Sequence, residues 1–144
     1  MHRCNDRRGK INGMVALYNE FKATFGKFCK EIGKALTADT LYNVGFKQAS
    51  PVSLLLTFFD RVEMAVTFEP VLDDSGDLRA RIVATVEEEV VKILYFDRGG
   101  RVTESVGQTM SNINMLSLPG INLLVLFFID QLIERGMAFE TVAE

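Results

Sequence analysis

The period of the hydrophobic pattern changes along this chain, and that change most constrains the fold. Over residues 10–36 the large apolar residues recur at helical spacing, and on a wheel of about 100° per residue they share a sector of about 120°. The opposite side carries residues such as Glu20, Lys27 and Lys34. The pattern predicts one long amphipathic helix, with an apolar side made of Ile11, Met14, Leu17, Tyr18, Phe21, Phe25, Phe28, Cys29, Ile32 and Leu36.

From Val62 the period becomes two, which is typical of a β-strand with one buried face. Residues 62–69 and 78–86 alternate in this way around the turn-forming residues 73–76, so they are expected to form a hairpin. A third run at 90–96 leads through a turn at 97–100 into a fourth at 101–105. The middle of the chain is therefore predicted to be an antiparallel β-meander of about four strands.

Residues 50–59 fit two structures. Ser50 followed by Pro51 is typical of a helix start, whereas the apolar run at 52–59 is short enough for a buried strand. We expect a short helix there. Residues 41–46 alternate as a short strand does, and the polar residues 107–117 are expected to form a loop.

Pro119 and Gly136 delimit a final helix. Its broad apolar side, expected to cover the sheet, consists of Ile121, Val125, Leu126, Phe128, Ile129, Leu132 and Ile133. The opposite side is also apolar in the first turns, where Leu123, Leu124 and Phe127 stand. Large apolar side chains on the outer side of a two-layer domain normally need a cover. The sequence leaves three possible covers open: the first helix, a second copy of the chain, and a partner or apolar ligand.

These segments predict an α+β domain with a long N-terminal amphipathic helix, an antiparallel β-meander of about four strands, and a C-terminal helix packed on the sheet. We expect residues 14–144 to form this single domain. Residues 1–13 are expected to be a flexible basic leader, without the apolar segment of a secretory signal. The leader's charges are Arg3, Arg7, Arg8 and Lys10 against Asp6 alone.

Charge, hydrophobicity and cysteine content indicate which partners and which cellular compartment to expect. The net charge is −3 and the chain after the leader is acidic, which disfavours nucleic-acid binding. The apolar run at 123–129 is far below the roughly 18–20 residues of a membrane span, and peripheral membrane contact is not expected either. Cys4 and Cys29 have neither metal-ligand spacing nor the pattern of a disulfide framework, which favours a cytoplasmic protein.

The chain contains one histidine, His2, in the predicted leader. Imidazole is the usual proton shuttle and the commonest metal ligand, so a Ser-His-Asp triad, a Cys-His pair and a three-ligand zinc site are not available to the domain. The acidic triplet at 87–89, the calcium-like spacing at 73–77 and the arginines at 79, 81, 98 and 101 are each interpreted more simply as solvated surface. We predict no catalytic residue, no metal site, no cofactor and no enzyme.

Two classes of function remain. The first is a protein-interaction module, such as an adaptor, a chaperone-like or an inhibitor-like protein, that forms a homodimer through Leu123, Leu124 and Phe127 of the final helix. The alternative is a pocket protein that binds a small apolar ligand between the sheet and the C-terminal helix, in a site lined by Phe68, Tyr95 and Phe128.

Overall fold

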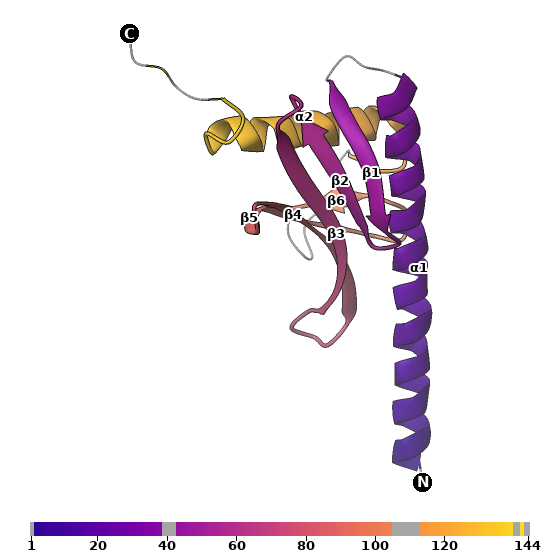
Figure 1. Ribbon diagram of the computed structural model, residues 1–144. Helices are drawn as coiled ribbons and strands as arrows, with labels where there is room; N and C mark the ends of the chain where they lie inside the picture. The colour runs from indigo at the N-terminus through magenta and orange to yellow at the C-terminus, as the bar shows by residue number, and fades with distance from the viewer. Residues whose placement is uncertain (1, 39–42, 105–112, 140–141, 143–144) are drawn as a thin grey trace.

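Two helices pack against a six-stranded antiparallel sheet in the computed structural model, which describes residues 2–38, 43–104, 113–139 and 142 (Figure 1). Each strand pairs with the next one along the chain. The predicted α+β class is confirmed, with six strands in place of about four. The elements are α1 (His2–Ala38), β1 (Val44–Ser50), β2 (Ser53–Phe58), β3 (Val62–Leu72), β4 (Leu78–Val86), β5 (Glu89–Phe96), β6 (Val102–Thr103) and α2 (Leu118–Glu134).

The additional strands lie at the beginning of the sheet. The short helix predicted within residues 50–59 is wrong, because this segment is the strand β2, held between β1 and β3. Leu54, Leu56 and Phe58 of β2 are fully buried, and this burial between two paired strands outweighs the local helix signal of Ser50 and Pro51. β1 continues the run expected at 41–46, of which residues 41 and 42 lie outside the described part.

The predicted hairpin and the strands after it are confirmed. β3 and β4 pair from Ala65 opposite Thr85 to Leu72 opposite Leu78, and Gly76 takes a φ of +81° in the turn between them. β5 leads through the turn at 97–100 into the short strand β6. Of the loop expected at 107–117, residues 107–112 lie outside the described part.

Both helices cover the same face of the sheet. The fully buried strand residues alternate along each strand and share one face through the pairing registers, and they form a single core with buried residues of α1 and α2. Side chains on the other face, including Thr57, Thr67, Arg81 and Tyr95, are only partly buried. Among the described residues, one face of the meander is therefore not covered by a helix.

α1 is longer than the sequence predicts. It begins at His2, so residues 2–13 are helical, and its first turns extend beyond the sheet (Figure 1). The predicted apolar side is buried from Phe21 to Leu36, whereas Ile11 is 58% exposed. No proline interrupts the polar residues of the first turns, so they can continue the helix. The division of the chain at residue 13 stays a prediction.

α1 also spans the width of the sheet. Near its C-terminal end, Gly33 approaches Phe46 of β1 so closely that an added β-carbon would lie 2.9 Å from the ring. In its middle, the Thr24 hydroxyl donates a hydrogen bond of 2.9 Å to the carbonyl of Arg98, in the turn between β5 and β6. The two contacts anchor α1 near both lateral ends of the sheet, and they place its last turns beside β1.

Candidate functional site

The first candidate site is the outward flank of α2. The helix begins where the Ser117 side chain accepts a hydrogen bond of 3.1 Å from the Gly120 amide, with Pro119 in the first turn. It ends at Gly136, where the main chain takes a φ of +68°. These two signals are the ones that the sequence analysis used, and both predicted ends are confirmed within two residues.

The three predicted interface residues do not share one environment. Leu124 is 1% exposed, so its place in the interface is a wrong prediction: it is covered within the chain, on the side of α2 that joins the core. Leu123 is 48% exposed. Phe127 is half-buried, with the Lys92 ammonium 5.4 Å from the centre of its ring and the Phe128 ring beside it.

Two residues predicted to cover the sheet instead face outward. Leu126 is 41% exposed and Ile133 is 50% exposed. With Leu123 they form what we call the outer stripe of α2: Leu123, Leu126 and Ile133. Because the helix is apolar almost all round in its first turns, periodicity alone does not determine which side meets the sheet.

The three predicted pocket residues lie in different surroundings in the described structure. Phe68 is 3% exposed and packs against the rings of Tyr18, Phe25 and Phe96, while Phe128 is 1% exposed in the core. Tyr95 lies opposite Arg81 on the face of the sheet that neither α1 nor α2 covers. The alternation of β5 predicts this, because Leu94 and Phe96 on either side of Tyr95 are buried.

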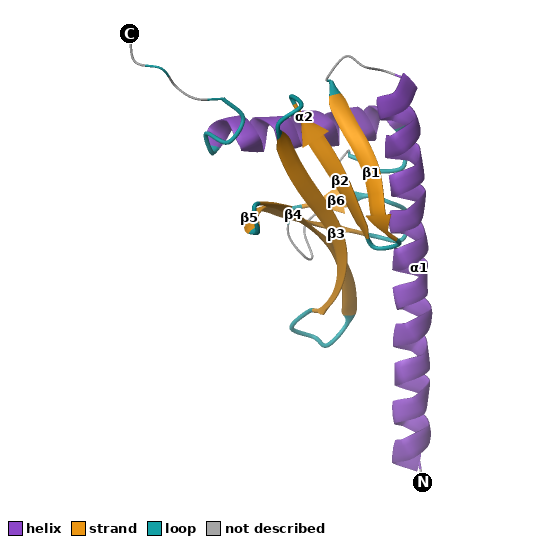
Figure 2. Cartoon of the chain, in the orientation of Figure 1, coloured by secondary structure: helices purple, strands orange, loops and turns teal. Residues whose placement is uncertain are grey.

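The last turns of α1 and the strand β1 run side by side (Figure 2). A cavity of about 780 Å³ lies between them. We call it the α1–β1 groove. Its walls are mostly apolar, and they include Gly26, Cys29, Lys30, Gly33 and Lys34 of α1 and Phe46 of β1. The site is not predicted from the sequence, because it depends on β1 returning beside α1. The sequence signal that points toward it is the pair Gly26 and Gly33 within an otherwise regular helix.

Cys29 is fully buried at the floor of this groove. Burial raises the pKa of its thiol from 9.0 to about 12, and a hydrogen bond with its own backbone only partly opposes this effect. The thiolate is the reactive form of cysteine. Cys29 is therefore suited to packing and not to nucleophilic chemistry.

We expect the Cys29 thiol to resist 5,5′-dithiobis(2-nitrobenzoate) at pH 8 in a Cys4→Ser background, and to react once urea unfolds the protein. A pKa of about 12 leaves roughly 10⁻⁴ of the thiol ionised at that pH. The folded state keeps this proton above pH 9, where the unfolded state loses it. The free energy of unfolding, relative to a Cys29→Ala variant, should therefore fall by up to about 1.4 kcal/mol per pH unit between pH 9 and 12. Rapid labelling of the folded protein at pH 8 would contradict this assignment.

Three of the four arginines considered as an anion site are paired within the chain. Arg79 contacts Asp73 at 2.8 Å, Arg81 contacts Glu69 at 2.8 Å, and Arg98 contacts Glu20 at 3.1 Å. The Asp73 carboxylate also accepts the amides of Ser75 and Asp77, and these bonds together with Arg79 lower its pKa. Asp73 thus organises its own turn, which favours a structural role over calcium binding.

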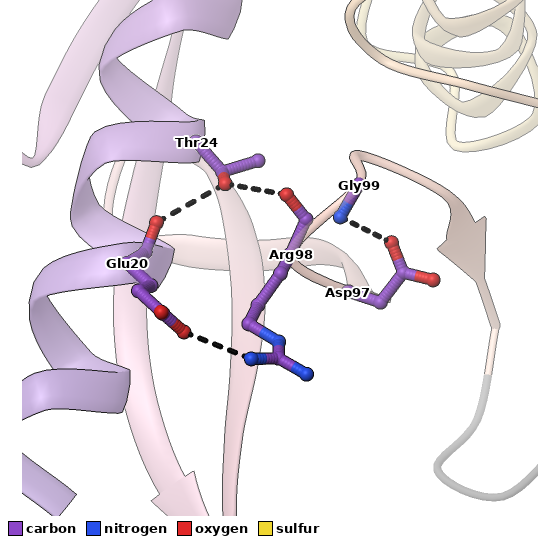
Figure 3. Close-up of polar contacts among 5 residues, drawn as sticks. All are labelled: Glu20, Thr24, Asp97, Arg98 and Gly99. Carbon is purple, nitrogen blue, oxygen red and sulfur yellow. Dashed lines mark hydrogen bonds and ion pairs between the residues drawn. The ribbon is translucent and has the colours of Figure 1, made fainter.

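The contacts around Arg98 fasten the turn between β5 and β6 to α1. Figure 3 shows the Thr24 hydroxyl between the carbonyls of Glu20 and Arg98, at 3.1 and 2.9 Å. The Asp97 carboxylate accepts the Gly99 amide at 2.9 Å within the turn. The Arg98 and Glu20 side chains are largely exposed, so their ion pair contributes little. These contacts favour a structural role for the cluster, which ties the turn between β5 and β6 to α1.

Within the described residues, no helix is both long and apolar enough to cross a bilayer, and no three His, Cys, Asp or Glu side chains gather as metal ligands would. A scan against protein-family models and searches of curated proteins and of solved structures found no significant match to this chain.

Proposed function

We propose that this chain is a non-enzymatic, cytoplasmic protein-interaction module that pairs with a second copy of itself through the outer stripe of α2. The observation that carries the proposal is the exposure of Leu123, Leu126 and Ile133, which keep between 41 and 50% of their surface after the chain has folded. Fully burying a leucine or isoleucine side chain contributes roughly 1.5–3 kcal/mol. A partner that covers all three recovers a substantial part of that free energy.

The spacing of the outer stripe favours another helix as its cover. Positions 123, 126, 130 and 133 lie three, four and three residues apart, as along the seam of a two-helix coiled coil. The outer stripe occupies three of these positions, and Asp130 occupies the fourth. A parallel pair would bring the two Asp130 carboxylates together at this seam. An antiparallel pair about a two-fold axis separates them, so we propose the antiparallel arrangement.

The chemistry of the described residues supports a role without catalysis. The Cys29 thiol has a raised pKa that opposes nucleophilic use, and three of the arginines are paired with the chain's own carboxylates. The alternative of a ligand pocket between sheet and α2 has less support, because Phe68 packs against Tyr18 and Phe25 of α1 and Phe128 is buried in the core.

We expect the double substitution Leu123→Lys with Leu126→Lys to convert a dimer into a monomer in native mass spectrometry and light scattering. Two lysines would place charge inside an apolar contact, whereas both positions are exposed in the single chain, so the folded protomer should lose less than about 1 kcal/mol. Circular dichroism would check that the protomer stays folded. A substitution at Phe127 is less informative, because it would also remove the contact of the Lys92 ammonium with its ring within the protomer.

The matched control is Ile11→Lys with Val15→Lys, two exposed apolar positions on the projecting part of α1. It should leave the dimer intact. Loss of the dimer in the control alone would move the interface to α1 and overturn the proposal, as would a wild-type protein that is monomeric at every concentration. An added mass of a few hundred daltons on the wild-type protein would instead favour ligand binding.

A further inference from the structure

We propose that the α1–β1 groove binds an extended acidic segment of a partner protein, whose main chain adds to the sheet as a strand beside β1. This inference rests on the proposed function in so far as it assigns a partner to an interaction module. It concerns a different surface from the outer stripe of α2. The proposed strand addition and the proposed homodimer can therefore be disproved independently.

The first observation is that β1 is the open edge of the sheet. At the opposite end, β6 is covered: the Val102 amide donates to the Ile113 carbonyl at 3.0 Å, and the Met115 amide donates to the Gly100 carbonyl at 2.8 Å. Within the described ranges, no backbone hydrogen bond reaches β1 from an element other than β2. Every second residue of β1 thus offers its amide and carbonyl to a further strand.

The second observation is the groove that flanks this edge. Successive side chains of an added strand point to opposite faces of the sheet, so every second one would enter the space between β1 and α1. The half-buried Phe46 ring and the helix face with Gly26 and Gly33 line that space and offer an apolar side chain a contact surface. Main-chain pairing together with side-chain pockets is the recognition mode of added strands.

The third observation is charge. α1 belongs to a segment, residues 1–38, with eight Lys and Arg against three Asp and Glu. At the rim of the groove, Lys30 is exposed and has no ion pair within the described part of the chain, while Lys34 lies 3.6 Å from Glu31. Lys47 is exposed on β1 itself. An acidic segment meets complementary charge here.

The same charges argue against a second copy of this chain as the occupant. Two-fold pairing of β1 with β1 would bring Lys30, Lys34 and Lys47 of one copy close to the same lysines of the other. Like charges placed in this way oppose association. The groove therefore favours a foreign acidic strand over self-association.

The test uses fluorescence anisotropy with the full-length protein and a fluorescein-labelled peptide, Ser-Val-Thr-Glu-Thr-Glu-Ser. In an extended strand its valine and both glutamates lie on one face. We expect saturable binding, weakened at least tenfold when lysine replaces both glutamates. Two further peptides carry N-methyl groups, one at the second and fourth residues and the other at the third and fifth. Only one of these two should lose binding, because a strand pairs with β1 through one edge.

The variant Gly26→Leu should weaken binding at least tenfold by filling the groove. A β-carbon at Gly26 meets nothing within 4 Å, so the variant keeps the fold. Gly9→Leu is the matched control, because it is the same change on the same helix, also in open space and outside the groove. Lys30→Glu should weaken binding, and Lys27→Glu, which is exposed but does not line the groove, should weaken it less.

Absence of peptide binding at millimolar concentration, or equal binding by wild type and Gly26→Leu, would overturn the proposal. Binding unaffected by either methylation pattern would also overturn it, because it would indicate a side-chain pocket without strand addition. A dimer that is lost in Gly26→Leu but kept in Leu123→Lys with Leu126→Lys would show that the occupant is a second copy. The peptide-binding results leave the mass measurement on the outer stripe of α2 unchanged, whereas a dimer lost only in Gly26→Leu would overturn that interface as well.

Discussion

The substitution Gly120→Ala should unfold the protein or destabilise it by about 3 kcal/mol or more, measured by urea denaturation. A β-carbon at Gly120, in the first turn of α2, would lie 1.8 Å from the carbonyl oxygen of Asn114 and 2.6 Å from its carbonyl carbon. Both are main-chain atoms, which cannot rotate away as a side chain can.

Asn114 is also held from several sides. Its side chain accepts the Leu116 amide at 2.8 Å and donates to the Gly99 carbonyl at 3.1 Å, while its own carbonyl accepts the Ser117 hydroxyl at 3.0 Å. A shift that makes room for alanine at position 120 would disturb these bonds and the contact with the turn before β6. We therefore expect a loss much larger than the usual effect of exchanging glycine for alanine in a helix.

Gly9→Ala is the control, because position 9 lies in α1 with nothing within 4 Å of an added β-carbon. It should stabilise the protein by up to about 1 kcal/mol through helix propensity alone. If Gly120→Ala unfolded at the same urea concentration as the wild type, the close packing of residue 114 against the first turn of α2 would not hold in solution.

The sequence predicts those parts of the fold whose pattern is local. The period of 3.6 in α1, the period of two in β3 and β4, and the turn residues at 73–76 each act over a few neighbours, and the structure confirms all three. β2 could not be predicted in the same way. Ser50 and Pro51 give a genuine local helix signal, and burial of Leu54, Leu56 and Phe58 between two strands distant in sequence overrides it.

The outer stripe of α2 and the α1–β1 groove also differ in how far the local sequence predicts them. The need to cover part of α2 could be read from its composition, but the side that faces outward depends on how α1 and the sheet share the core. For that reason Leu124 and Leu126 exchange their expected places. The α1–β1 groove is formed by two separate segments of the chain, and the glycines at 26 and 33 mark one of them without indicating that β1 lies beside it. Its prediction requires the path of β1 beside α1.

Leu123→Ala and Leu124→Ala should differ strongly in their effect on stability. The two leucines are neighbours in α2, with the same helix propensity and the same chemistry, but their exposures are 48% and 1%. Leu124→Ala removes side-chain atoms from a packed core and should cost about 2–5 kcal/mol in the free energy of unfolding. Leu123→Ala should change the stability of the single protomer by no more than about 0.5 kcal/mol.

Urea denaturation at a low and a high protein concentration separates the two kinds of burial. A dimer is stabilised by mass action, so the urea midpoint of the wild type should rise with protein concentration. Leu123→Ala should reduce this rise. Leu124→Ala should keep the rise but lower the midpoints at the low and the high protein concentration by similar amounts. Equal losses from the two substitutions at low concentration would mean that Leu123 is buried within the protomer. A midpoint independent of concentration in all three proteins would leave the outer stripe of α2 without a second copy to cover it, and the proposed homodimer would be wrong.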